Sequence, residues 1–216
     1  MLSITSKLGC RSWSLQAFDT CPGARASDGT VAEVCEGCYA RGGNYRFPAV
    51  KAVRERNRDD WQASDWTDRM VEAIGSDPYF RWFDSGDAYA LPLLRKIAEV
   101  IRRTPNTRHW LPTRMHKFPK FRPMLRVIAA MPNAVVRVSH DDVKRTGWTV
   151  QRDPLAAGIL QSAVIADPTV PTNAAVCGAY ERDGKCGECR VCWAKAVPAV
   201  AYPAHGRKMI KLVRVA

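Results

Sequence analysis

The chain has 216 residues, of which 46% are hydrophobic and 25% are charged, so it has the composition of a globular protein and enough length for one full core. No apolar run approaches the roughly 18 residues that a transmembrane helix needs, which excludes a helical membrane protein. The first residues lack the apolar core of a secretory signal, so we expect a cytoplasmic location. Lys and Arg number 33 against 21 Asp and Glu, a net charge of +12 that favours anionic partners.

Short strand-like runs alternate with longer helical runs along the chain, which is typical of βα units. We expect strands over 11–18, 79–83, 107–111, 134–138, 161–165 and 208–215. We expect helices over 48–62, 64–74, 91–103 and 119–130, with Ser64 as the cap of the second. The fold class is therefore α/β. A complete eight-fold barrel usually takes about 250 residues, so an incomplete parallel (β/α) barrel-like sheet of about six strands, or an open sheet, is favoured. Residues 1–170 would form this body, and residues 171–216 a metal-binding segment with a closing strand.

Polar residues follow three of the expected strands. They are Asp84, Ser85 and Asp87; Thr113 and Arg114; and Ser139, His140, Asp141 and Asp142. Ligands bind at the carboxyl ends of parallel strands, so these groups are candidates for substrate contact. Each also has a structural interpretation. Asp87 and Asp142 would suit helix caps, and His140 would suit a hydrogen-bonded structural histidine. We expect Trp82 and Trp110 to belong to the core.

The positive charge is concentrated between Arg95 and Arg126, where ten basic residues accompany one acid, Glu99. Aromatic residues are interleaved with them. Cations replace phosphate counterions and flat rings stack on bases, so this stretch predicts nucleic acid as a partner. A solvated basic helix face with core aromatics is the alternative. If nucleic acid is the partner, the candidate substrate-binding residues of this stretch are Arg114, Lys117, Lys120 and Arg122.

Eight cysteines in a chain without an export signal indicate metal binding rather than disulfides. Four of them form C-x8-C-x2-C-x2-C within sixteen residues, namely Cys177, Cys186, Cys189 and Cys192. Four thiolates either close a tetrahedral zinc site or ligate an iron–sulfur cluster, and the spacing leaves both open.

A second group consists of Cys21 and the pair Cys35 and Cys38. Three thiolates on a loop after a first strand leave one coordination position open, as catalysis requires. Thirteen residues separate Cys21 from Cys35, so the spacing alone does not bring the first thiol to the pair. A structural zinc that also uses Cys10 is the alternative.

The chain resembles the phage gene product 88 family over most of its length, which implies a phage protein in an infected host cell. The residues that carry the resemblance are Ser12–Leu15, Thr20–Gly23, Cys35–Ala40, Asp84–Asp87, His109–Arg114 and Lys185–Trp193. The run ending in Cys35-x-x-Cys38-Tyr39-Ala40 is also similar to the cluster loop of radical S-adenosylmethionine enzymes. That resemblance implies a [4Fe-4S] cluster on Cys21, Cys35 and Cys38.

The same resemblance assigns roles to other residues. It places the amino group of S-adenosylmethionine against Asp84, Ser85, Gly86 and Asp87, and an auxiliary cluster on the C-terminal cysteines. The substrate's polar edge would meet His140 or Asp141. This chain departs from the usual C-x3-C-x2-C spacing in its first gap.

A rival resemblance is to base-exchanging transglycosylases of tRNA or DNA. Asp84-Ser85-Gly86 is similar to their DSGG turn, Leu111-Pro112-Thr113-Arg114 to their LPTR, and the C-terminal cysteines to their zinc site. In that family Asp84 or Asp87 would contact the base or act as the nucleophile. Three hypotheses follow: a radical S-adenosylmethionine enzyme acting on nucleic acid or a nucleotide, a zinc-containing transglycosylase, and a non-catalytic phage protein that binds nucleic acid or a host factor.

Overall fold

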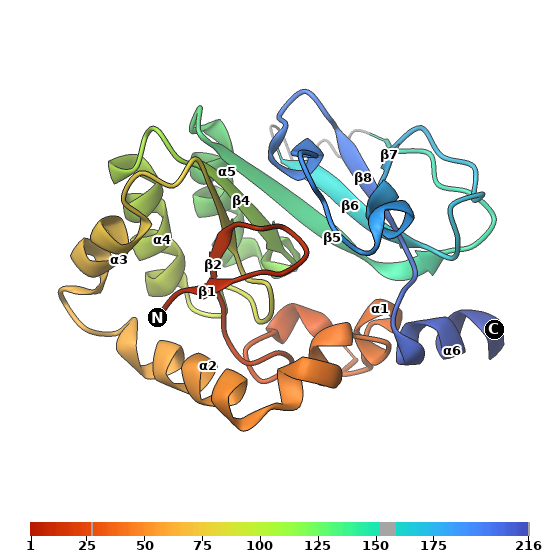
Figure 1. The fold of residues 1–216 in the computed structure, drawn as a ribbon, viewed down its shortest axis with the longest axis horizontal. Coiled ribbons are helices and arrows are strands. Elements are labelled where there is room, and N and C mark those ends of the chain that lie inside the picture. The colour runs from red at the N-terminus through yellow and green to blue at the C-terminus, as the bar shows by residue number, and fades with distance from the viewer. Residues whose placement is uncertain (27, 152–158, 216) are drawn as a thin grey trace.

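A mostly parallel sheet organises the chain in the computed structural model, which describes residues 1–26, 28–151 and 159–215 (Figure 1). Its strands lie in the order β1-β2-β3-β4-β5-β6-β8-β7, and only β1 runs antiparallel to its neighbour. The strands are β1 (Ser3–Ile4), β2 (Arg11–Trp13), β3 (Tyr79–Trp82), β4 (Arg108–Thr113), β5 (Ala134–Lys144), β6 (Leu160–Ile165), β7 (Ala175–Val176) and β8 (Ala199–Pro203).

Six α-helices accompany these strands among the described residues. They are α1 (Glu33–Glu36), α2 (Pro48–Asp60), α3 (Trp66–Ile74), α4 (Leu91–Arg103), α5 (Arg122–Ala130) and α6 (Arg207–Val215). Figure 1 shows α3 and α4 on one side of the sheet and α1, α2 and α6 along one end of it. None of the helices in the described part of the chain is both long and apolar enough to cross a bilayer.

The two faces of the sheet are covered differently, because side chains alternate along each strand. Phe80, Trp82, Leu111 and Val136 point into the main core, which also contains buried residues of α3, α4 and α5. Their neighbours Tyr79, Trp110 and Val135 belong to a second cluster, which includes Trp193 and three of the C-terminal cysteines, Cys177, Cys186 and Cys192. The segment with these cysteines therefore covers the face that the helices leave open.

Periodicity predicted the central helices well. The helix expected over 91–103 has those bounds, and its apolar residues Leu94, Ile97, Ala98 and Ile101 are all buried. The expectation that Trp82 and Trp110 are core residues is confirmed, since they are 0% and 5% exposed. The mixed α/β class with a mostly parallel sheet is confirmed as well.

Several expectations about elements were wrong. The strand expected over 208–215 is the helix α6, and β8 supplies the last strand of the sheet instead. The cap of α3 is Asp65, without a side-chain cap bond, rather than Ser64. The strand expected over 11–18 is only three residues long, whereas β5 continues past residue 138. A barrel is not confirmed, because the described strands end at β1 on one side and at β7 on the other.

Candidate active site

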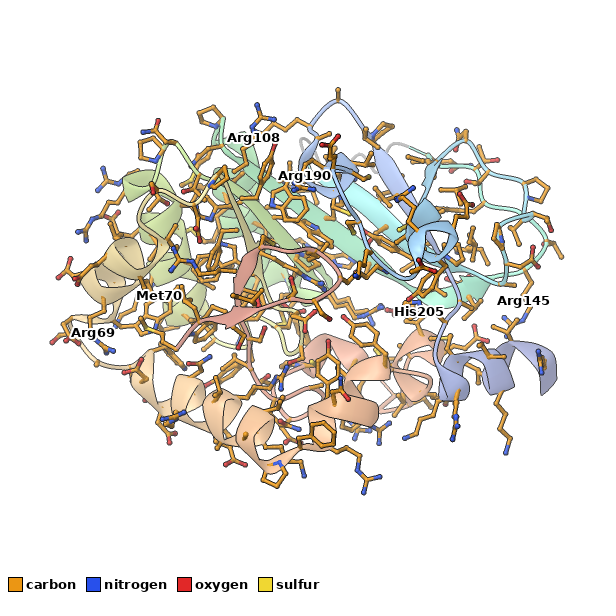
Figure 2. All side chains as sticks on the ribbon, in the orientation of Figure 1. Arg69, Met70, Arg108, Arg145, Arg190 and His205 are labelled. Atoms are coloured by element: carbon orange, nitrogen blue, oxygen red, sulfur yellow. The ribbon has the colours of Figure 1, made fainter. Side chains whose placement is uncertain are left out.

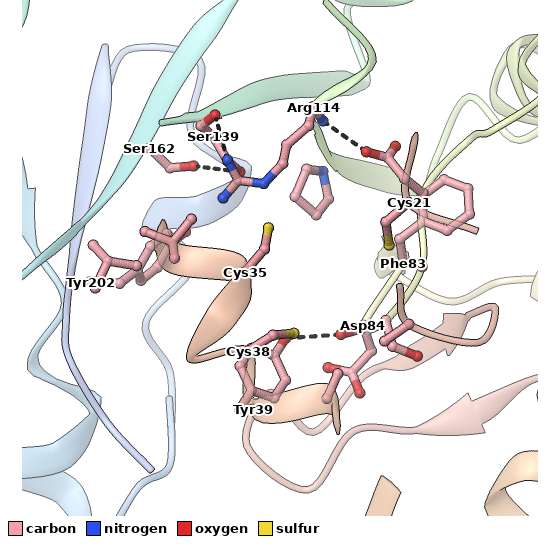
Figure 3. A pocket seen from close by; sticks show the side chains of 18 of the residues that line it. Cys21, Cys35, Cys38, Tyr39, Phe83, Asp84, Arg114, Ser139, Ser162 and Tyr202 are labelled. Carbon is pink, nitrogen blue, oxygen red and sulfur yellow. Dashed lines mark hydrogen bonds between the residues drawn. The ribbon is translucent and has the colours of Figure 1, made fainter. Parts of the chain in front are cut away.

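A cavity of about 390 Å³ lies at the carboxyl ends of the parallel strands. Its lining includes three groups that the sequence analysis singled out. These are the N-terminal cysteines Cys21, Cys35 and Cys38; the residues after strands, Asp84–Asp87, Thr113, Arg114, Ser139 and His140; and the C-terminal cysteines Cys177, Cys186 and Cys192. Figure 3 shows the thiols of Cys21, Cys35 and Cys38 directed into the same space beneath Arg114. The fold thus gathers residues that are more than 150 positions apart in the sequence.

A small hairpin accounts for the long gap between Cys21 and Cys35. After Cys21 the chain makes a 3-10 turn over Pro22–Ala24, and Arg25 then forms an antiparallel bridge with Val31. The Ala32 amide donates to the Ala24 carbonyl at 2.8 Å, which closes the hairpin at its base. Because the two ends of the hairpin meet at its base, the helix α1, which follows the hairpin and carries Cys35, begins close to Cys21.

The three N-terminal thiols lie close enough to influence one another's ionisation. Burial raises the pKa of Cys21 to about 12, and the charges of Asp87, Cys38 and Cys35 add to the increase. Burial also raises the pKa values of Cys35 and Cys38. The thiolate forms of these cysteines are therefore disfavoured by burial and by mutual repulsion. A positively charged metal centre would stabilise these thiolates.

The C-terminal cysteines form a second group around Cys177. The charge of Cys177 raises the pKa of both Cys186 and Cys192, and that of Cys189 raises the pKa of Cys186, each after burial as the main cause. Cys192 reaches a pKa of about 11, and its Sγ lies 3.2 Å from the Tyr202 hydroxyl. Cys189 is exposed, and Cys10 packs against the same hydrophobic cluster without lining the cavity.

Arg137 anchors this segment to the sheet. It lies on β5 and is 0% exposed. Its guanidinium donates to the carbonyls of Val191, Cys192 and Ala194 at 3.0–3.2 Å. No carboxylate of the described residues forms an ion pair with it. Burial lowers the pKa of Arg137, and the nearby side chains of Tyr202 and Cys192 oppose this decrease. A buried cation without a carboxylate partner favours negative charge on the nearby sulfur atoms.

The turn after β3 is a hub of polar contacts. Asp84 accepts a hydrogen bond from Tyr45 at 2.5 Å and forms an ion pair with Arg81 at 3.0 Å, while its carbonyl accepts the Tyr39 hydroxyl at 2.8 Å. Phe83, which precedes it, has a left-handed φ of 56° that a bulky residue adopts only under constraint. This turn is held rigidly at the cavity wall.

Asp87 is the buried carboxylate of the same turn, and it does not cap the following helix α4, whose N-cap is Ala90. Its Oδ1 accepts from the Thr113 hydroxyl and the Ala88 amide at 2.8 Å each, and its Oδ2 accepts from the Arg114 amide at 2.8 Å. Burial raises the pKa of Asp87, and these donors oppose the rise. Asp87 therefore joins the ends of β3 and β4 within the site.

Arg114 connects β4 to β5. One of its guanidinium nitrogens donates to the His140 carbonyl and to the Asp141 carboxylate, both at 2.7 Å. Lys117 forms an ion pair with the same carboxylate and donates to the Gly23 carbonyl. His140 shares a hydrogen bond with Gln161 at 3.0 Å, as in the structural interpretation, although it also lines the cavity. Residues 139–142 lie within β5 rather than after it, and Asp142 pairs with Lys144 instead of capping a helix.

The basic stretch does not form one surface. Arg102 pairs with Glu99 and Arg103 with Asp68 on the helical side of the sheet. Arg122 donates to the His116 carbonyl, and Lys120 lies over the Phe121 ring. Of the four candidate substrate-binding residues, only Arg114 lines the cavity.

Sequence reasoning missed several residues of the cavity wall. They are Arg81, Tyr202, His205, Ser162 and Met209. Alternation within the expected strand over 79–83 places Arg81 on the face opposite Phe80 and Trp82, so this residue was within reach of sequence analysis. Tyr202 lies on β8, which was not expected, and it was therefore out of reach.

The side chains do not form a preformed single-ion site. Among the residues that the structure describes, no three or more His, Cys, Asp and Glu side chains are arranged to hold one metal ion. The two groups of thiols are therefore gathered around a shared cavity without the close tetrahedral arrangement of a zinc centre.

Comparison with models of protein families gives a match over most of the chain. A family model described as gene product 88 matches residues 2–195, which include both groups of cysteines and the whole cavity except its C-terminal contributors. Comparisons with curated proteins and with solved structures gave no match.

Proposed function

The chain belongs to the gene product 88 family of phage proteins, and from this premise and the cavity we propose that it is an iron–sulfur enzyme of the radical S-adenosylmethionine type that acts on nucleic acid or a nucleotide. The observation that carries the proposal is the convergence of Cys21, Cys35 and Cys38 on one cavity at the carboxyl ends of parallel strands. In this proposal the sheet, whose strands follow the chain order from β1 to β6, is an incomplete barrel.

The residues present fit a cluster better than a zinc ion at the N-terminal group. Each thiolate of a [4Fe-4S] cluster binds a separate iron, so the ligand sulfurs surround a body larger than one ion. The three thiols are close enough to raise one another's pKa, but among the described residues they are not arranged around a single ion. Both observations support a cluster as the bound group. When bound, such a cluster would supply the electron for reductive cleavage of S-adenosylmethionine.

Protein groups would orient the cofactor and exclude water. Each carboxylate oxygen accepts two hydrogen bonds, so Asp84 and Asp87 keep acceptor positions beyond the contacts that hold their turn. These positions suit an ammonium group. Arg114 has further guanidinium hydrogens for an anionic group, because only one of its nitrogens contacts the Asp141 side chain and the β5 carbonyls.

The C-terminal cysteines would hold an auxiliary cluster or a zinc ion. The buried Arg137, which contacts the Cys192 carbonyl and lies near the Cys192 thiol, supports a negatively charged centre, which either a zinc ion or a cluster would form with four thiolates. The other two hypotheses, a transglycosylase and a non-catalytic binding protein, both predict that zinc is the only metal in the protein.

Metal analysis after anaerobic reconstitution tests the proposal. We expect brown protein with iron and acid-labile sulfide, at about four iron atoms for each occupied cluster. Replacing Cys35 and Cys38 by Ser would remove the N-terminal iron, whereas Cys10→Ser is the matched control and would keep it. Reconstituted protein without iron would contradict the proposal, and zinc in its place would favour the alternatives.

Cofactor cleavage tests the assignment of the first cluster. With a strong chemical reductant, the wild-type protein and Cys10→Ser would release 5′-deoxyadenosine from S-adenosylmethionine, and the Cys35/Cys38 double variant would not. Replacing Cys186 and Cys189 by Ser would leave this cleavage in place. If both double variants cleave as the wild type does, the N-terminal cysteines do not hold the reactive centre.

A further inference from the structure

The C-terminal helix α6 has a charge pattern that does not serve its own folding. Its nine residues include Arg207, Lys208, Lys211 and Arg214 and no acidic residue, and all four cations are exposed. Like charges three and four positions apart destabilise a helix, and cations in the first turn oppose the helix dipole. None of the four forms an ion pair or a side-chain hydrogen bond with the residues that the structure describes. An external anion would relieve this repulsion.

The opposite face of α6 is fixed at the cavity. Met209 lines the cavity and packs against Gly37, which lies between Cys35 and Cys38. Leu212 and Val213 join Met209 and Val34 in one hydrophobic cluster. The cations of α6 therefore lie on the outer side of a helix that forms part of the cavity wall. Figure 2 shows nitrogen-tipped side chains projecting from this helix away from the body of the protein.

The part of the basic run that lies on α4 lacks these two properties. Arg102 and Arg103 are already paired with carboxylates, and Lys96 donates to the carbonyls of Trp61 and Ala63. These residues lie on α4, which packs on the sheet face opposite the cysteine segment. None of these α4 cations lines the cavity, whereas α6 forms part of its wall.

The depth and size of the cavity indicate whether a single-stranded or a double-stranded nucleic acid would be the substrate. The reactive region is recessed and has a volume of about 390 Å³, so a base stacked within a duplex does not reach it. Enzymes that act on bases therefore take a single strand or extrude the nucleotide. An exposed row of cations beside such a recess suits the backbone of a single strand, with the target nucleotide turned inward.

We propose that α6 is the docking surface for the phosphate backbone of a single-stranded nucleic acid, and that it delivers one nucleotide of that strand to the adjoining cavity. This inference rests on the proposed function for the identity of the reaction, but the binding that it describes requires no turnover. In this inference α6, rather than the stretch 95–126, makes most of the electrostatic contacts with the phosphates.

Neutralisation of matched sets of cations tests the inference. In one variant Lys208, Lys211 and Arg214 become Gln; in the control Arg95, Arg102 and Arg108 become Gln, with the same change in net charge. Binding of a fluorescein-labelled short single-stranded DNA or RNA would be measured by anisotropy across a salt series. We expect the α6 variant to bind about tenfold or more weakly, with the slope of log K against log salt reduced by about 2, since each lost phosphate contact contributes about 0.7. The control would bind nearly as the wild type does.

A second variant guards against loss of the helix. With Lys208→Arg and Lys211→Arg the charges remain, and we expect wild-type binding; circular dichroism and thermal unfolding would show that all the variants fold. Equal weakening by α6 and control neutralisation would overturn the inference, as would tighter binding of duplex DNA than of single strands. Binding of poly-glutamate as tightly as nucleic acid would overturn it too, because an acidic protein would then be the partner.

Iron content and S-adenosylmethionine cleavage, measured on the same preparations, separate this inference from the proposed function. Protein that holds iron and cleaves the cofactor but binds no single strand would refute the inference and leave the function standing. Protein that binds single strands through α6 but takes up no iron would refute the function and leave the inference standing.

Discussion

At the scale of single residues, His109 illustrates how burial fixes a protonation state. Its side chain is 0% exposed between Trp82 and Thr104. The Trp82 indole N–H donates to Nδ1 at 3.3 Å, and the Thr104 hydroxyl, which itself donates to the Val100 carbonyl, lies 2.8 Å from Nε2. Only the neutral ring with hydrogen on Nε2 satisfies both contacts, so burial lowers the pKa of His109 to about 3.

We expect this histidine to make the protein less stable in acid. Because its pKa falls on folding, the unfolded chain binds more protons below pH 6.5, and stability is lost as the pH decreases from there toward 3. The loss has a limiting slope of about 1.4 kcal/mol per pH unit for one group. Urea unfolding at pH 7 and pH 5 would show a smaller difference for His109→Gln than for the wild type. An equal difference in both proteins would contradict the assignment.

Residue chemistry also explains which site residues could be predicted. Cysteines and acidic turns were found because their types and spacing are distinctive, and the thiols do converge on one cavity. Arg137 was not found, since a basic residue within a β-branched run gives no sign that the segment 191–194 will cover it. Its role depends on contacts between residues more than 50 positions apart.

At the scale of elements, the errors in the sequence analysis have physical causes. The residues of α6 include Ile210, Val213 and Val215, which favour strands, but the apolar positions Met209, Leu212 and Val213 follow helical spacing and face α1. The strand β8 is short and has proline at its end, so its pattern was too weak to recognise. Polar residues in β5 suggested a strand end where the chain has a bulge between Ser139 and Val143.

The contact between α1 and α6 predicts an energetic coupling. A Cβ added at Gly37 would lie 2.9 Å from Met209 Cε and 3.0 Å from Met209 Cα, so Gly37→Ala would displace α6 and lower the stability. Met209→Ala would remove the closest of these atoms at the cost of its own packing. In a urea double-mutant cycle, we expect the double variant to be at least about 0.5 kcal/mol more stable than the sum of the single effects predicts. Additive effects would contradict the contact.

At the scale of the whole molecule, one sheet face depends on the cysteine segment for its cover. Trp110 and Val135 are buried beneath it, and Trp193 packs edge-on to Trp110 with ring centroids 5.3 Å apart. The mixed α/β class followed from the alternation of elements. The covering of this face did not, because the segment has little regular structure and is held by Arg137 and by packing.

Arg137 variants would test how this covering contributes to stability. Arg137→Met would leave the carbonyls of Val191, Cys192 and Ala194 without their donor, at a cost of about 1–3 kcal/mol for each that stays buried. We expect lower stability in urea, faster proteolysis within 177–193 and less metal at the C-terminal cysteines. Arg137→Lys, which keeps the charge, would retain more metal than the Met variant. A Met variant that matches the wild type in all three measurements would contradict the anchoring role.

Because of the hairpin between Cys21 and Cys35, the positions of the two sulfur atoms do not depend on the number of residues in the loop. Since Ala24 and Ala32 already meet at its base, residues can be added or removed at its tip, around Gly29, while both thiols stay in place. A database query that demands a fixed interval between the first two cysteines would overlook chains built in this way. Aligning such chains on the base of the hairpin, with its tip treated as a variable insert, would recover them.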